Sequence, residues 1–272
     1  MKALFIFASV VVFAFGSTST EQSYTGSTPA APVVRSFFGI SQNESIDFIR
    51  WQLTLSDDHY KLVCNYGVGK PNTSGFMNGG KHIEMSGLLK REKSQYRLMN
   101  VGKTLALAEV NNNLLHILDS EGHLIAGTGG WSYTLNNLDP IPSAQSAWLG
   151  QPVAIKDSIS FVGRTPCGVA GFADRKECYK LKWAVVFYKG GTAGSGKYRL
   201  WGSPWYKEGG RRGAWKMVEE KDHRIFYLLN DDKGNEFARL LTLDENILAF
   251  TDAKGNLLVG NPDFSYTLNR RW

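Results

Sequence analysis

The sequence has few residues of the kinds that enzymes use for chemistry. Its 272 residues include only five histidines and three cysteines. It contains no Gly-x-Ser-x-Gly segment, the turn that presents a nucleophilic serine in many hydrolases. We therefore expect a protein without catalytic residues, which is not an enzyme.

Long apolar runs are also missing, except at the N-terminus. There, Lys2 precedes an apolar run over residues 3–15, which is shorter than the roughly 20 residues that a membrane helix needs. The small residues Ala14 and Gly16 stand where a signal peptidase reads the chain. This pattern predicts a signal peptide over residues 1–16 and a secreted or periplasmic protein with no transmembrane segment. No cysteine stands directly after the run, where a lipid would be attached, so we expect no lipid anchor.

Charge of one sign is not concentrated anywhere in the chain. The formal net charge is +6, and the 31 basic and 25 acidic side chains are scattered along the sequence. Scattered charges are typical of a solvated surface, so we expect no nucleic-acid partner. Residues 17–34 are rich in Ser, Thr, Ala and Pro, which predicts a flexible leader.

The three cysteines leave two interpretations open. In an oxidising compartment, Cys167 and Cys178 are expected to form a disulfide, which leaves Cys64 as a buried apolar residue. The alternative is a copper or zinc site. Its ligands would come from one of two sets, which are Cys167, Cys178 and Met217, or Cys64, Met77, His82 and Met85. Neither set has a diagnostic spacing, so we expect no metal and no cofactor.

The chain contains an internal duplication. Ser-Tyr-Thr-Leu-Asn occurs at residues 132–136 and again at 265–269, an offset of 133 residues. The preceding Asp-x-x-Gly turns, at 119–122 and 252–255, keep this offset, and Trp51 matches Trp183. Near the starts of the copies, Phe38-Gly39 resembles Val162-Gly163. So many ordered matches indicate two copies of one domain.

Each copy has the pattern of an antiparallel β-structure. Apolar residues alternate with polar ones around Trp51 and Trp183, as in half-buried strands. Turns follow at short intervals, and we find no amphipathic helix. The sequence therefore predicts an all-β protein with two tandem small antiparallel, lipocalin-like β-barrels, over residues 35–137 and 158–272, joined by a linker over residues 138–157.

The second copy also resembles a known family. It has Phe161-Val-Gly-Arg-Thr-Pro-Cys167, then Gly196-Lys-Tyr-Arg-Leu200, Gly213-Ala-Trp215 and a late Asp-x-x-Gly turn. This order is similar to the N-terminal domain of the bacterial envelope proteins called copper resistance or copper homeostasis protein NlpE. The resemblance implies a lipocalin-like barrel in the bacterial envelope. The family shows Cys-x-x-Cys after the proline, whereas Gly168-Val-Ala-Gly171 follows Cys167 here, and the first copy has Ile40-Ser-Gln-Asn43 in that place.

These observations predict a secreted or periplasmic, non-enzymatic protein that binds a small ligand or an envelope protein, or acts in envelope homeostasis. The alternatives are a copper- or zinc-binding envelope protein and, last, an enzyme of unknown type. A dense group of aromatic residues could stack on a ligand, and its members are Trp201, Trp205, Tyr206 and Trp215. The copies differ most in the loop over residues 163–178, so that loop and the seam between the copies are the first places to look for a site.

Overall fold

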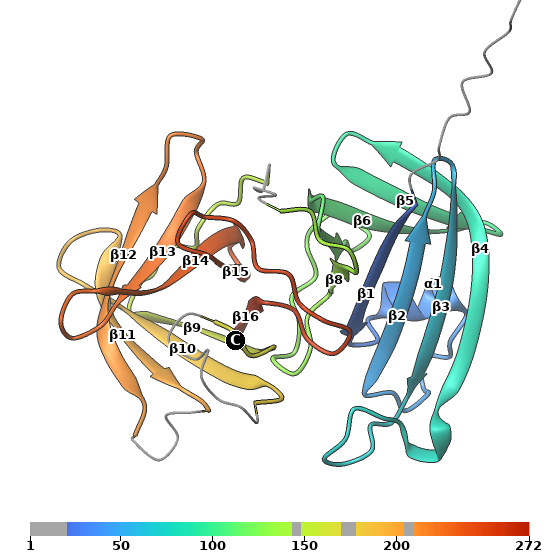
Figure 1. Cartoon of the computed structure of the whole chain (residues 1–272), viewed down its shortest axis with the longest axis horizontal. Helices are drawn as coiled ribbons and strands as arrows, with labels where there is room; N and C mark the ends of the chain where they lie inside the picture. Colours follow the sequence, from blue (N-terminus) through green and yellow to red (C-terminus); the bar gives the residue numbers. More distant parts are fainter. Residues whose placement is uncertain (1–20, 143–147, 170–177, 204–208, 272) are drawn as a thin grey trace, which may run out of the picture.

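The computed structural model describes residues 21–142, 148–169, 178–203 and 209–271. It contains two closed antiparallel β-barrels of eight strands each, which lie side by side (Figure 1). The all-β prediction with two tandem lipocalin-like barrels is confirmed. The predicted signal peptide lies outside the described residues. Within the described residues, no helix has the length and the apolar character to cross a membrane.

The first barrel closes through pairing of its first and last strands. Its strands are β1 (Gln22–Thr28), β2 (Phe48–Leu55), β3 (His59–Gly67), β4 (Lys81–Glu92), β5 (Gln95–Asn100), β6 (Lys103–Asn111), β7 (Leu114–Ile117) and β8 (Thr134–Asn137). A short helix, α1 (Pro32–Phe38), follows β1, and a 3-10 turn, η1 (Met77–Gly79), precedes β4.

The second barrel repeats this order and closes between β9 and β16. Its strands are β9 (Ser158–Thr165), β10 (Leu181–Lys189), β11 (Ser195–Trp201), β12 (Arg211–Glu219), β13 (Ile225–Asn230), β14 (Glu236–Asp244), β15 (Ile247–Thr251) and β16 (Thr267–Arg271). Between β8 and β9, the described residues of the predicted linker contain no strand or helix.

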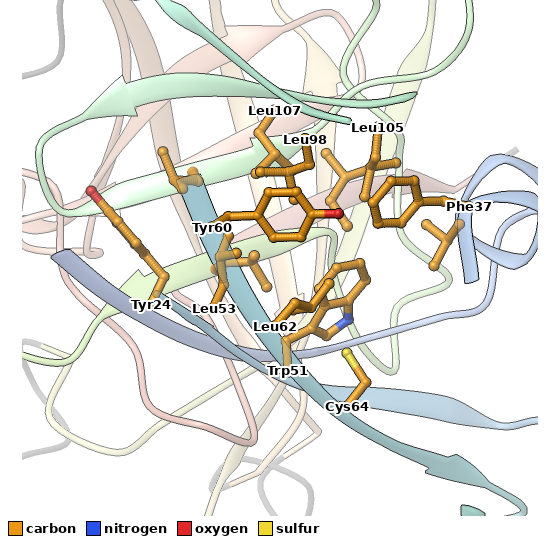
Figure 2. Close-up of a cluster of buried hydrophobic side chains, with 14 of the residues drawn as sticks. Tyr24, Phe37, Trp51, Leu53, Tyr60, Leu62, Cys64, Leu98, Leu105 and Leu107 are labelled. Carbon is orange, nitrogen blue, oxygen red and sulfur yellow. The ribbon is translucent and has the colours of Figure 1, made fainter. Parts of the chain in front are cut away.

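Side chains fill the interior of the first barrel. Alternate residues of β2 and β3 point inward, so that Trp51, Leu53, Tyr60 and Leu62 are fully buried. Figure 2 shows Phe37 of α1 pointing into this cluster toward Tyr60. The helix therefore packs its apolar face against the core, which is why a segment of only seven residues is stable as a helix. The expectation of no helix is wrong at this point.

The predicted flexible leader is also wrong over its described part, where β1 and the start of α1 lie, while residues 17–20 lie outside the described residues. The same hydrogen-bonded relay marks the true start of each copy. Trp51 Nε1 donates to Thr28 Oγ1, and Trp183 Nε1 donates to Thr165 Oγ1, both at 2.8 Å. Each threonine hydroxyl then donates to the carbonyl of the proline that follows it.

This relay corrects the alignment of the two copies. Thr28-Pro29-Ala30 corresponds to Thr165-Pro166-Cys167, so the first barrel begins at β1 and not at residue 35. Neither Phe38-Gly39 nor Ile40-Ser-Gln-Asn43 is the counterpart of the family-like opening of the second copy. The residue that corresponds to Cys167 is Ala30, in the turn between β1 and α1.

Candidate functional site

The duplicated Ser-Tyr-Thr-Leu-Asn segments meet each other at the seam between the barrels. Ser132 Oγ lies 2.6 Å from Ser265 Oγ, its own counterpart 133 residues later. Asn136 Oδ1 accepts a hydrogen bond from Gly260 N, and Asn269 Oδ1 accepts the equivalent one from Gly127 N. Each copy thus donates one of these hydrogen bonds and accepts the equivalent one. This is the geometry of a two-fold symmetric dimer interface.

An apolar layer extends this symmetric contact. Its members come from the outer faces of the last strands of both barrels, and four corresponding pairs are Ala108 and Leu241, Val110 and Leu243, Leu114 and Ile247, and Leu124 and Leu257. All are buried. In Figure 1, the segment between β15 and β16 reaches across to the first barrel, where Pro262 O accepts a hydrogen bond from Ser27. The barrels are therefore packed as one unit.

A pocket of about 230 Å³ opens on this seam. The first barrel contributes Asp47, Phe48 and Arg50, the loop around residues 69–74, and Trp131, while the second contributes Arg164, Tyr179, Lys180, Asp263 and Phe264. The volume is below the roughly 300–1,000 Å³ that is typical of ligand pockets, so only a small molecule fits. We call this cavity the seam pocket.

Asp263 is neutralised by contacts from both barrels. Arg50 forms an ion pair with it across the seam, and Tyr179 OH donates to its other oxygen at 2.8 Å. Arg50 also donates to Ser74 O, while its Nε is buried without a hydrogen-bond partner among the described residues. This network holds the wall of the pocket in place, and Arg50 compensates the negative charge of Asp263.

Two further cations lie on aromatic rings in the pocket. Arg164 lies over Trp131, with its Cζ 5.5 Å from the ring centre, and Lys180 Nζ lies 5.6 Å from the centre of Phe264. Burial lowers the pKa of Lys180, and the nearby charges of Arg164 and Lys182 lower it further, against a smaller opposing effect of Asp263. Within the described part of the chain, neither Arg164 nor Lys180 forms an ion pair with a carboxylate. The pocket therefore has an excess of positive charge.

A second hollow, of about 570 Å³, lies beside the seam pocket and shares Arg164 with it. Its walls are the Gly-rich loop of residues 127–130 and the side chains of Val162, Arg164, Arg270 and Arg271. No acidic side chain lines it among the described residues. Both hollows thus favour anions at the seam.

The predicted disulfide is present in the structure, whereas two members of the predicted aromatic group lie on opposite faces of the sheet. Cys167 and Cys178 form a disulfide. Trp215 is 4% exposed and packs in the core between Phe187 and Tyr227. Trp201 lies on the opposite, outer face of the sheet. Trp205 and Tyr206 lie outside the described residues, so the stacking role of this group stays a prediction.

The proposed metal ligands do not converge in the structure. The disulfide uses the sulfur atoms of Cys167 and Cys178, and Cys64 is fully buried, where burial raises the pKa of its thiol. His82 contacts Asn65 and Glu84 on the surface. Across the described ranges, no three His, Cys, Asp or Glu side chains gather as metal ligands would.

The sequence pointed to the seam but not to the residues of its pocket. In the corrected alignment, Lys180 and Arg164 of the pocket stand at positions where the first copy has a different residue. Phe48, which stacks on Trp131, corresponds to Lys180, which lies over Phe264. Ser27 corresponds to Arg164. At these two positions of the seam, the second copy therefore has cations where the first copy has Phe48 and Ser27.

Comparisons with protein families, curated proteins and solved structures find no significant match.

Proposed function

We propose that this protein is a secreted or periplasmic, non-enzymatic binding protein that holds a small anionic ligand with an apolar body in the seam pocket. The observation that carries this proposal is the pair Arg164 and Lys180, which lie on aromatic rings without a carboxylate partner among the described residues. Partly buried cations that no carboxylate contacts directly favour an anion from solution. Trp131, which lines the pocket and is partly exposed, offers contact area for an apolar body.

The test is calorimetric titration of the full-length protein with benzoate and phenyl phosphate, each at pH 7. Benzamide serves as the neutral analogue of the same shape. We expect at least one of the anions to bind more tightly than benzamide. We expect the double variant Arg164→Gln, Lys180→Gln to lose about tenfold in affinity, because charge-assisted hydrogen bonds to a bound anion are removed.

Lys182→Gln is the matched control. Lys182 lies near Lys180 but does not line the pocket, so this variant should lose much less affinity than the double variant, through the longer-range effect of its charge alone. Binding should also weaken as the pH rises through the lowered pKa of Lys180, below its ordinary value of 10.5. The proposal fails if both anions bind no better than benzamide, or if Lys182→Gln loses as much affinity as the double variant.

A further inference from the structure

The second barrel carries a separate basic surface on its outer face, away from the seam pocket. A hollow of about 1200 Å³ lies over β11 and β12 and is bordered by the turns after β10 and β13. The cationic side chains that line it are Lys189, Lys197, Arg199, Arg212 and Lys216, and the acidic ones are Asp231 and Asp232. We call this surface the basic hollow.

Strand alternation places four of these five cations on the outside of the barrel. Tyr198 and Leu200 of β11 are buried in the core, so Lys197 and Arg199 face outward. On β12, Trp215 is buried and its neighbours Ala214 and Lys216 are exposed. Lys197, Arg199, Arg212 and Lys216 therefore lie on one continuous outer face, whereas Lys189 borders the hollow from the end of β10, in register with the buried Phe187.

The most informative pair within this face is Arg199 and Arg212, which stand directly opposite each other on neighbouring strands. Like charges at directly opposed positions destabilise a sheet. In the described part of the chain, no carboxylate forms an ion pair with either of them. Arg199 Nε is moreover buried without a hydrogen-bond partner there. A surface with this unfavourable pair is one that an anionic ligand would stabilise.

The two acidic side chains of the hollow do not balance its five cations. Asp231 lies 3.7 Å from Arg211, a residue outside the hollow, and its other oxygen accepts hydrogen bonds from the backbone of its own turn. The five cations and two carboxylates leave the hollow with an excess of three positive charges. Several cations spread over an open surface match a polymer with repeated negative charges.

We infer that the basic hollow binds an acidic polysaccharide, one that carries sulfate or uronate groups. Single-stranded nucleic acid fits less well because it stacks successive bases on several exposed rings, and among the described aromatic residues that line the hollow only Tyr188 is exposed. Trp201 is covered by the guanidinium group of Arg199, 4.3 Å from its ring centre, and Tyr198 and Trp215 are 1% and 4% exposed. A sugar chain needs only one ring at the edge, and Tyr188, 41% exposed and opposite Lys197, provides it.

The experiment measures binding of the full-length protein to a short heparin oligosaccharide and to oligogalacturonate. A neutral dextran oligosaccharide and a single-stranded DNA oligonucleotide of similar length are the comparison probes. We expect one of the acidic sugars to bind more tightly than both comparison probes, with an affinity that falls as the salt concentration rises. Arg199→Gln with Arg212→Gln, and separately Lys197→Gln with Lys216→Gln, should each weaken binding about tenfold.

The first barrel offers a matched control. Tyr60 opposite Gly87 corresponds to Tyr198 opposite Gly213, so Lys61 and Lys90 stand where Arg199 and Lys216 do. Lys61→Gln with Lys90→Gln should change the affinity by less than about twofold. The inference is overturned if neither acidic sugar binds, if dextran or DNA binds as tightly, or if the control pair loses as much affinity. Because the seam variants leave this face unchanged, they should bind acidic sugar normally.

Discussion

At the scale of single residues, His116 is a buried histidine whose hydrogen bonds determine its protonation state. Its ring is fully buried, with Nε2 2.9 Å from Ile125 O and Nδ1 2.9 Å from Thr134 Oγ1. Because a carbonyl oxygen only accepts, Nε2 must carry the proton and Nδ1 must accept from the threonine. Burial lowers the pKa of His116 to about 4. The folded protein therefore holds this side chain neutral.

This histidine makes stability depend on pH in a predictable direction. The unfolded chain binds a proton at the ordinary pKa of 6.5, whereas the folded protein binds it only near 4. The contribution of neutral His116 is thus complete above pH 6.5 and is lost as the pH falls toward 4. Between pH 7 and pH 5 we expect this residue to account for a loss of about 2 kcal/mol in the free energy of unfolding.

Urea unfolding at both pH values checks this expectation. His116→Gln keeps a donor and an acceptor but does not titrate, so its free energy of unfolding should fall less at pH 5 than that of the native protein. His123→Gln is the control, because the His123 side chain is 70% exposed in a turn. An equal pH dependence of the native protein and His116→Gln would contradict the assignment.

At the scale of elements, the two barrels hold the segment after their first strand in different ways. In the first barrel, α1 buries Val34 and Phe37 against the core. In the second barrel, Cys167 and Cys178 are linked, Val169 packs into the core, and Tyr266 OH donates to Cys167 O at 2.6 Å. The segment after the first strand is thus held by apolar packing in the first barrel. In the second barrel, the equivalent segment is held by a disulfide.

Removal of the disulfide should therefore affect one barrel more than the other. A disulfide that closes a loop of this length contributes about 3 kcal/mol through the unfolded chain. In the variant Cys167→Ser, Cys178→Ser, we expect faster amide hydrogen exchange in β9 and β10, with β2 and β3 nearly unchanged. Mass spectrometry of peptides from the four strands measures this directly. Unchanged exchange in β9 and β10 would show that the disulfide does not limit local opening.

At the scale of the whole molecule, the seam has the symmetry of a dimer within one chain. The reciprocal contacts of Asn136 and Asn269 require close approach of the partner backbone. A Cβ atom on Gly127 would lie 3.1 Å from Asn269 Cγ, and one on Gly260 would lie 2.7 Å from Asn136 Oδ1. Together with the buried apolar layer, these contacts should hold the barrels together without the linker.

A protease site inserted between Pro142 and Trp148 of the full chain tests this. After cleavage, the two halves should elute together in size-exclusion chromatography at micromolar concentration. A cut protein that also carries Val110→Asp and Leu243→Asp should separate, because these substitutions place two charges in the apolar layer. Separation of the cut protein without these substitutions would show that the linker is needed.

Much of the fold could be predicted because strand alternation and duplication are local properties of the sequence. The start of the first copy could not, since β1 is rich in Ser and Thr. Its outward residues Thr25 and Ser27 are buried all the same, where they donate to Trp51 O and Pro262 O. Hydrogen bonds within the barrel and across the seam make this burial favourable, and composition alone does not reveal such partners.

The sequence by itself determined that the chain forms two β-barrels and that Cys167 and Cys178 are the cysteines to pair. The docking of the barrels, and with it the seam pocket, was decided by the tertiary structure. Arg50 and Asp263 are 213 residues apart in the chain, and they meet only because the apolar outer faces of the last strands pack against each other. The physical reason is that alternation tells which face of a strand is apolar, but not which other surface will cover it.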